Sequence, residues 1–138
     1  MKKPKVFARG VLGGLLAVAS ISPAFALDAC PDLSGTFECP ASGKQLAMTL
    51  TVTNKPTVDG GMSYKFSYRL MGKDIASEGD ALPKGTSKAD PANLCSGAAY
   101  IHKPAGEPGD GTRSSINAAG DFERASGGKI EMTCVRKK

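Results

Sequence analysis

The most distinctive residues that could bind a ligand are three aromatic side chains in the stretch MSYKFSYRL, residues 62–70. Tyr64, Phe66 and Tyr68 occupy every second position, so in a β-strand they share one face. Such a face can hold an amphipathic small molecule, because the rings contact its apolar part and the two phenol hydroxyls orient its polar part. The alternative is core filling, since an eight-stranded barrel is only wide enough for its own side chains. Tyr64 and Tyr68 are therefore candidate ligand-binding residues.

Residues suited to catalysis or metal binding are few. A hydrolytic triad needs a base, and the single histidine, His102, directly precedes Lys103-Pro104, where a loop is expected. Neither Ser96 nor Ser114 lies in a motif typical of a nucleophile. The sequence has no C-x-x-C pair and no calcium loop with alternating carboxylates. We therefore expect a non-enzymatic protein that uses no metal and no cofactor.

The four cysteines indicate two disulfides, because an even number of cysteines is typical of small exported domains. Alternation in the strands around Cys95 and Cys134 turns both side chains inward and favours a bond between them. Cys30 then pairs locally with Cys39 across a bend at residues 31–35. The other two connectivities remain open, because a straight segment 31–39 would hold Cys30 and Cys39 too far apart to bond.

The first 26 residues have the organisation of a secretory signal: basic residues, the apolar run 11–21 and the small-residue site Ala24-Phe25-Ala26. We predict cleavage after Ala26, a single disulfide-stapled domain of residues 27–138, and a periplasmic or secreted location. The alternative reading takes residues 27–30, LDAC, as a lipoprotein box with an acylated Cys30. Asp28 within that box and the even number of cysteines both favour simple cleavage.

Cleavage removes most of the positive charge. The chain has 18 Lys and Arg against 13 Asp and Glu, for a net charge of +5, and the signal segment holds four of the basic residues, which leaves +1. Basic residues form a run only at 136–138, whereas nucleic-acid binding needs a basic patch on one face. We therefore expect no nucleic-acid partner. We also expect that the mature domain has no membrane-spanning segment and that it is a monomer.

Alternation of apolar and polar residues predicts antiparallel strands with one wet face, most clearly at 45–53 and 62–70. Further strands are expected at 35–39, around Ile75, and at 94–102, 112–118, 121–126 and 129–136. Loops rich in Pro, Gly and charged residues are expected at 83–93 and 103–112. The fold class is all-β, a small antiparallel meander β-barrel of about eight strands, with a two-sheet β-sandwich as the alternative.

Three short motifs resemble those of periplasmic inhibitors of C-type lysozyme, which are small antiparallel barrels. Residues 37–39, FEC, match the family's aromatic-x-Cys in the first strand. Residues 96–100, SGAAY, match its S-G-x-x-Y loop in full. Residues 122–128, FERASGG, stand where the family has Y-x-x-x-T-K-G.

The resemblance implies that Ser96 and Tyr100 in the first loop, and Ser126 with Lys129 in the second, reach into a lysozyme active site. The second motif departs from the family at Gly127, where the family has its active-site lysine, and Lys129 stands two positions later. The chain thus presents three hypotheses. The first is a binder of an unknown small molecule or envelope component, the second is a lysozyme inhibitor, and the third is a structural envelope protein.

Overall fold

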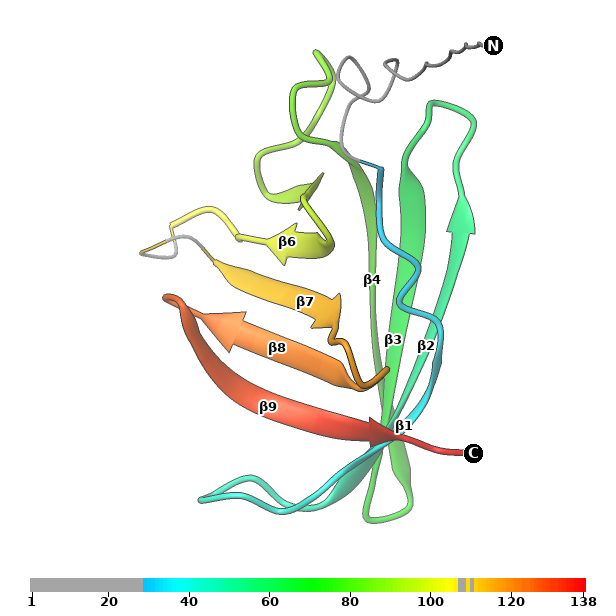
Figure 1. Cartoon of the computed structure of the whole chain (residues 1–138), viewed down its shortest axis with the longest axis vertical. Coiled ribbons are helices and arrows are strands. Elements are labelled where there is room, and N and C mark those ends of the chain that lie inside the picture. Colours follow the sequence, from blue (N-terminus) through cyan, green and yellow to red (C-terminus); the bar gives the residue numbers. More distant parts are fainter. Residues whose placement is uncertain (1–28, 107–108, 110) are drawn as a thin grey trace, which may run out of the picture.

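The computed structural model describes residues 29–106, 109 and 111–138. The expected signal peptide and its cleavage site lie outside this range. Nine strands form a closed barrel in which each strand neighbours the next and the last pairs with the first (Figure 1). The strands are β1 (Gly35–Cys39), β2 (Met48–Pro56), β3 (Met62–Leu70), β4 (Lys73–Pro83), β5 (Asn93–Ser96), β6 (Ala99–His102), β7 (Thr112–Ile116), β8 (Phe122–Ser126) and β9 (Lys129–Arg136). The all-β prediction and the choice of a barrel over a sandwich are confirmed.

The part of the chain that the structure describes contains no apolar helix long enough to cross a membrane. In Figure 1 the long strands β2, β3 and β4 stand on one side, and the shorter strands β6–β9 form the other. Their inner faces meet in the barrel interior.

The strands β2 and β3 form the most regular hairpin, and their alternation has the expected effect. Leu50 of β2 lies opposite Tyr68 of β3, and Val52 lies opposite Phe66. Leu50, Val52 and Phe66 are buried, which follows from their position on the inner face. Leu46 is more than half exposed, because β2 begins only at Met48.

The middle of the chain differs from the sequence prediction in three ways. The strand expected as a short segment around Ile75 is β4, which extends to Pro83. The strand expected at 94–102 is two strands, β5 and β6, joined by a turn at residues 97–98. The barrel is also not wholly antiparallel, because β4 and β5 pair in parallel through Leu82 and Pro83. The residues between β4 and β5 supply the crossover that a parallel pair needs.

The disulfide pairing predicted from the sequence is wrong. The bonds are Cys30–Cys95 and Cys39–Cys134. Cys39 ends β1, which is straight and carries it away from Cys30. Barrel closure then brings β1 against β9, with Glu38 opposite Val135, so that Cys39 meets Cys134. The predicted inward orientation of Cys95 and Cys134 is right, because both are buried, but the two residues lie on different parts of the barrel wall.

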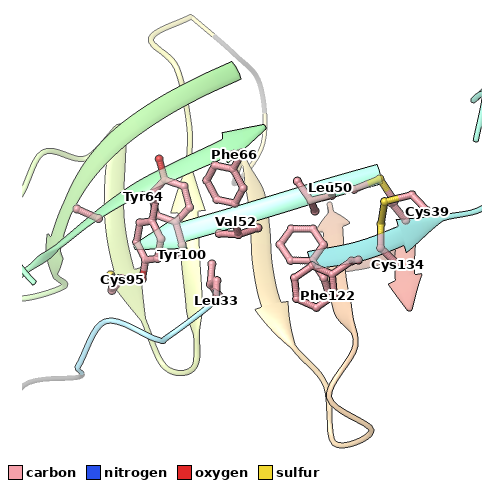
Figure 2. Close-up of a cluster of buried hydrophobic side chains, with 13 residues drawn as sticks. Leu33, Cys39, Leu50, Val52, Tyr64, Phe66, Cys95, Tyr100, Phe122 and Cys134 are labelled. Atoms are coloured by element: carbon pink, nitrogen blue, oxygen red, sulfur yellow. Dashed lines mark hydrogen bonds between the residues drawn. A yellow bond between two sulfur atoms is a disulfide. The ribbon is translucent and has the colours of Figure 1, made fainter. Parts of the chain in front are cut away.

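The core is a continuous row of buried side chains that runs along the interior. Figure 2 shows this row from Tyr100 and Cys95 at one end to the Cys39–Cys134 bond at the other. Aromatic rings form much of it, and the ring centroids of Tyr64 and Tyr100 are 4.7 Å apart. The interior is thus filled around Tyr64, and the space that remains lies to one side of the aromatic row.

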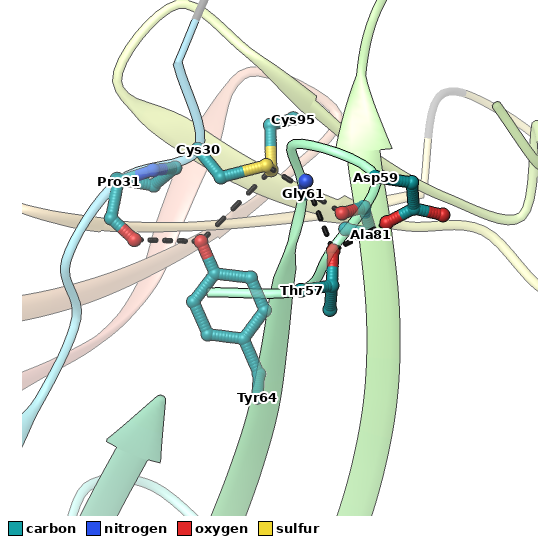
Figure 3. Close-up of a disulfide and its surroundings, with 8 residues drawn as sticks. All are labelled: Cys30, Pro31, Thr57, Asp59, Gly61, Tyr64, Ala81 and Cys95. Carbon is teal, nitrogen blue, oxygen red and sulfur yellow. Dashed lines mark hydrogen bonds between the residues drawn. A yellow bond between two sulfur atoms is a disulfide. The ribbon is translucent and has the colours of Figure 1, made fainter. Parts of the chain in front are cut away.

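The segment before β1 closes one end of the barrel. Leu33 is fully buried in the core, and its backbone N–H donates to Asn54 Oδ1 at 2.8 Å. The Tyr64 hydroxyl donates to the Pro31 carbonyl oxygen at 2.6 Å, beside the Cys30–Cys95 bond (Figure 3). Residues 30–33 are therefore fixed by a covalent bond, a buried apolar side chain and two hydrogen bonds.

Arg136 fastens the junction between the last strand and the first. Its guanidinium lies 4.8 Å from the centre of the Phe37 ring, and its Nε donates to the Gly120 carbonyl oxygen at 2.9 Å. The stem of this long side chain covers apolar surface while the charged group stays in contact with solvent.

Candidate functional site

A cavity of about 390 Å³ opens between β3–β4 on one side and β6–β9 on the other. This volume suits one small organic molecule. The lining combines aromatic rings with hydroxyl and charged groups, and it consists of Phe66, Tyr68, Ser77, Glu78, Tyr100, His102, Pro104, Thr112, Ser114, Arg124 and Glu131. An apolar wall with a few converging polar groups is the usual composition of a ligand site.

One wall of the cavity is a row of inward-facing side chains on adjacent strands. Tyr100 of β6 lies opposite Ser114 of β7, which in turn lies opposite Arg124 of β8. Residues directly opposite one another on antiparallel strands have side chains on the same face, with Cβ atoms about 5 Å apart. The register of β6, β7 and β8 therefore places a phenol, a hydroxyl and a guanidinium side by side.

Ser114 is the one buried polar side chain among the described residues, with 5% of its surface exposed. Within the described part of the chain its hydroxyl has no hydrogen-bond partner, although it lines the cavity. A buried polar group left without a partner costs about 1–3 kcal/mol. A hydroxyl in this position can be satisfied by a molecule that occupies the cavity.

Arg124 is a half-buried cation beside that hydroxyl. Its guanidinium donates to the Tyr68 hydroxyl oxygen and lies 5.6 Å from the centre of the Tyr68 ring, so it bridges β8 and β3 across the cavity. The one ion pair among the described residues joins Arg69 and Asp74 on the exposed surface. No described carboxylate forms an ion pair with Arg124, although Glu78 and Glu131 line the same cavity.

Asn93 of β5 fixes the orientation of two further lining groups. Its Oδ1 accepts a hydrogen bond from the Tyr100 hydroxyl at 2.6 Å and lies 2.8 Å from Nδ1 of His102. Since an amide oxygen only accepts, Nδ1 of His102 is the donor in this contact. Burial raises the pKa of Tyr100 to about 12, so this phenol stays protonated and keeps donating.

Gly79 of β4 makes room for this arrangement. A Cβ at position 79 would lie 2.5 Å from the Tyr100 hydroxyl oxygen and 3.3 Å from Asn93 Oδ1. Any larger residue would therefore push the Tyr100 phenol away from Asn93. This is a close approach of backbone to side chain of the kind that glycine permits in strands.

The two tyrosines predicted as ligand-binding residues have different positions. Tyr68 lines the cavity, so it stays a candidate ligand-binding residue. Tyr64 is 1% exposed and belongs to the core, where its hydroxyl is bonded to Pro31. Burial raises the pKa of Tyr64, and the neighbouring Tyr100 and Asp32 add to the rise.

The residues implied by the lysozyme-inhibitor resemblance do not gather in one place. Tyr100 lies inside the barrel, and Ser96 ends β5 at the turn 97–98. Ser126 and Lys129 are exposed and flank the turn 127–128. Ala99, which follows the first turn, lies opposite Ser115, whereas Ser126 lies opposite Thr112 at the other end of β7. The two turns are thus at opposite ends of the strands.

The sequence analysis did not single out Ser114 and Arg124 as candidate binding residues, although both line the cavity. The sequence did contain a signal for them, because Ser114 in β7 and Arg124 in β8 alternate with outward-facing residues and therefore face inward. An inward Ser or Arg in a short strand indicates a polar interior, provided that the face is known. That face is set by pairing with β6, which the sequence did not resolve.

No family model matches the chain, and comparison with curated proteins and with solved structures gives no significant match. The described residues include no group of three or more His, Cys, Asp or Glu side chains placed to hold a metal ion. The fold and the site define a small closed β-barrel, stapled by two disulfides, with a cavity between its two halves that is lined by aromatic, hydroxyl and charged side chains.

Proposed function

We propose that this protein is a non-enzymatic, exported binding protein that takes up one small organic molecule in the cavity between β3–β4 and β6–β9. The observation that carries the proposal is the Ser114 side chain, which belongs to a residue only 5% exposed, lines the cavity and has no hydrogen-bond partner in the described chain. Burying an unpaired hydroxyl is unfavourable. A ligand that pairs with it offsets that cost.

The lining supports binding rather than catalysis. The cavity contains one imidazole, of His102, whose Nδ1 is occupied by Asn93. Ser114 lies opposite Tyr100 and His102 lies opposite Thr112, so the serine and the imidazole are diagonal neighbours on the same face, and no hydrogen bond joins them within the described chain. The phenols and the guanidinium are suited to fix the orientation of a ligand.

The two disulfides are consistent with an oxidising compartment outside the cytoplasm. Export through the signal segment 1–26, to the periplasm or the medium, is part of the proposal. A mature chain that begins at Leu27 in the intact mass of the exported protein would support it, and a lipid-modified chain beginning at Cys30 would contradict it.

Binding can be mapped by titrating the 15N-labelled mature domain with four small probes, namely phenol, benzoate, benzylamine and N-acetylglucosamine. We expect at least one probe to shift the amide signals of Tyr100, Ser114 and Arg124 saturably, while signals of the β2–β3 turn near Val58 stay unchanged.

A pair of matched variants separates the cavity from the outer surface. Ser77→Trp places an indole at the rim of the cavity, and Ala76→Trp places one at the next position, on the opposite face of β4. Ser77→Trp should abolish the shifts and Ala76→Trp should preserve them. If no probe shifts the cavity signals, or if Ser77→Trp leaves binding unchanged, the proposal fails.

A further inference from the structure

We infer that the ligand is an organic monoanion, with a carboxylate that binds Arg124 and Ser114 and a ring or other apolar body that packs against Phe66 and Tyr100. This inference rests on the proposed function, and it names the chemical class of the molecule that the cavity takes.

The anion site is built from two neighbouring donors. A guanidinium has five N–H donors, and one described contact, to the Tyr68 hydroxyl, uses one nitrogen of Arg124. Ser114 lies directly opposite Arg124 in the β7–β8 ladder. A carboxylate placed between them accepts charge-assisted hydrogen bonds from Arg124 and a third bond from the buried hydroxyl.

Charge selects an anion at this position. Arg124 is half buried and forms no ion pair with a described carboxylate. A half-buried cation in a cavity attracts an anion more strongly than one in open solvent, because the local dielectric constant is lower. The two carboxylates of the same lining, Glu78 and Glu131, are exposed to solvent and more strongly screened. A positively charged ligand group beside Arg124 would be repelled.

Two carboxylates, Glu78 and Glu131, limit the ligand to one negative charge. They line the same cavity from β4 and β9 and are exposed to solvent. Water screens their attraction for Arg124, but a second negative charge on the ligand would lie in the cavity that both carboxylates line. Dianions such as phosphate monoesters are therefore disfavoured.

The part of the cavity wall that adjoins these donors is apolar and aromatic. The rings of Phe66 and Tyr100 have centroids 5.8 Å apart and are nearly parallel, with an interplanar angle of 18°. Their exposed parts line the cavity together with Pro104. An aromatic or other apolar body seated here leaves a carboxylate in reach of Arg124 and Ser114.

Calorimetric titration of the mature domain with benzoate, benzamide and phenyl phosphate tests the inference. We expect benzoate to bind at least about tenfold more tightly than benzamide, which has the same shape without the charge, since tenfold is the usual effect of one charge-assisted hydrogen bond. Phenyl phosphate should bind more weakly than benzoate, and Glu131→Gln should reduce that difference.

Matched variants assign the effect to the two donors. Arg124→Gln should remove the preference for benzoate over benzamide, and Ser114→Ala should weaken benzoate binding severalfold. The controls Arg113→Gln and Ser115→Ala change the same residue types at positions of β7 that face outward, and they should leave both affinities unchanged.

The outcomes separate this inference from the proposed function. Equal affinity for benzoate and benzamide, or a preference for benzoate that survives Arg124→Gln, overturns the anion inference while binding in the cavity stands. Preferred binding of benzylamine overturns it as well. If none of the probes binds in the cavity, the proposed function itself fails.

Discussion

The Tyr64 hydroxyl of β3 donates a hydrogen bond of 2.6 Å to the carbonyl oxygen of Pro31, a residue that precedes the first strand. The contact joins the middle of the barrel wall to the segment that closes its end. This contact explains why Tyr64 is part of the framework. Tyr68 lies four residues further along the same face of β3 and lines the cavity instead.

Tyr64→Phe should lower the free energy of unfolding by about 1–2 kcal/mol, because the Pro31 carbonyl oxygen loses its partner in a partly buried place. Urea denaturation measures this change. Thr49→Val is the control, since it removes a hydrogen bond of 2.8 Å to Glu38 that is exposed to solvent, and it should cost less than about 0.5 kcal/mol. Equal effects of the two variants would contradict the framework role of Tyr64.

Loss of either disulfide should destabilise the domain by a similar amount. The bonds close loops of 65 and 95 residues, for which chain entropy gives about 4 to 5 kcal/mol each. Urea denaturation of the paired variants Cys30→Ala with Cys95→Ala, and Cys39→Ala with Cys134→Ala, compares them. Non-reducing peptide mapping provides the check on pairing, where a peptide joining Cys95 to Cys134 would refute the account.

Stability should fall at alkaline pH because of Tyr100. Its folded-state pKa is raised to about 12, whereas an unfolded phenol ionises near pH 10. The stabilisation is therefore complete below about pH 10 and is lost as the pH rises toward about 12, with a slope of at most about 1.4 kcal/mol per pH unit for one phenol. Urea denaturation between about pH 9 and pH 12 should show a smaller slope for Tyr100→Phe. An unchanged slope would mean that the buried phenol does not govern this loss.

The purified domain should not slow cell-wall lysis by a C-type lysozyme. The two turns that resemble inhibitor loops lie at opposite ends of the strands, and Tyr100 points into the core rather than to a loop tip. A turbidity assay with up to high-micromolar protein measures inhibition. Inhibition that Ser96→Ala weakens, while the exposed control Arg69→Ala does not, would revive the inhibitor hypothesis.

The strands with strong alternation could be predicted from the sequence, and the strands without it could not. The ranges 35–39, 62–70 and 129–136 match β1, β3 and β9, because each buries every second side chain over at least part of its length. The strand β4 was underestimated, since its residues 73–78 are all exposed and its backbone pairing with β3 leaves no apolar pattern.

The positions of the candidate binding residues depend on long-range strand pairing, about which local sequence patterns carry no information. The turn at 97–98 reverses the chain, so that Tyr100 lies opposite Cys95 on the inner face. A single continuous strand over 94–102 would instead put Tyr100 and Cys95 on opposite faces. For the same reason, the sequence did not show that Ser114 and Arg124 are neighbours. It also did not show which cysteines meet when β1 pairs with β9.

Ligand binding in the cavity can be observed most directly with a single introduced tryptophan, because the chain contains none of its own. Tyr68→Trp introduces an indole into the cavity lining, and Val58→Trp introduces one at a fully exposed turn residue as the control. On titration with benzoate, the account predicts a saturable change in the emission of Tyr68→Trp and none in that of Val58→Trp. An emission that does not respond, or that changes equally in both variants, would contradict the central claim that this cavity binds a small molecule.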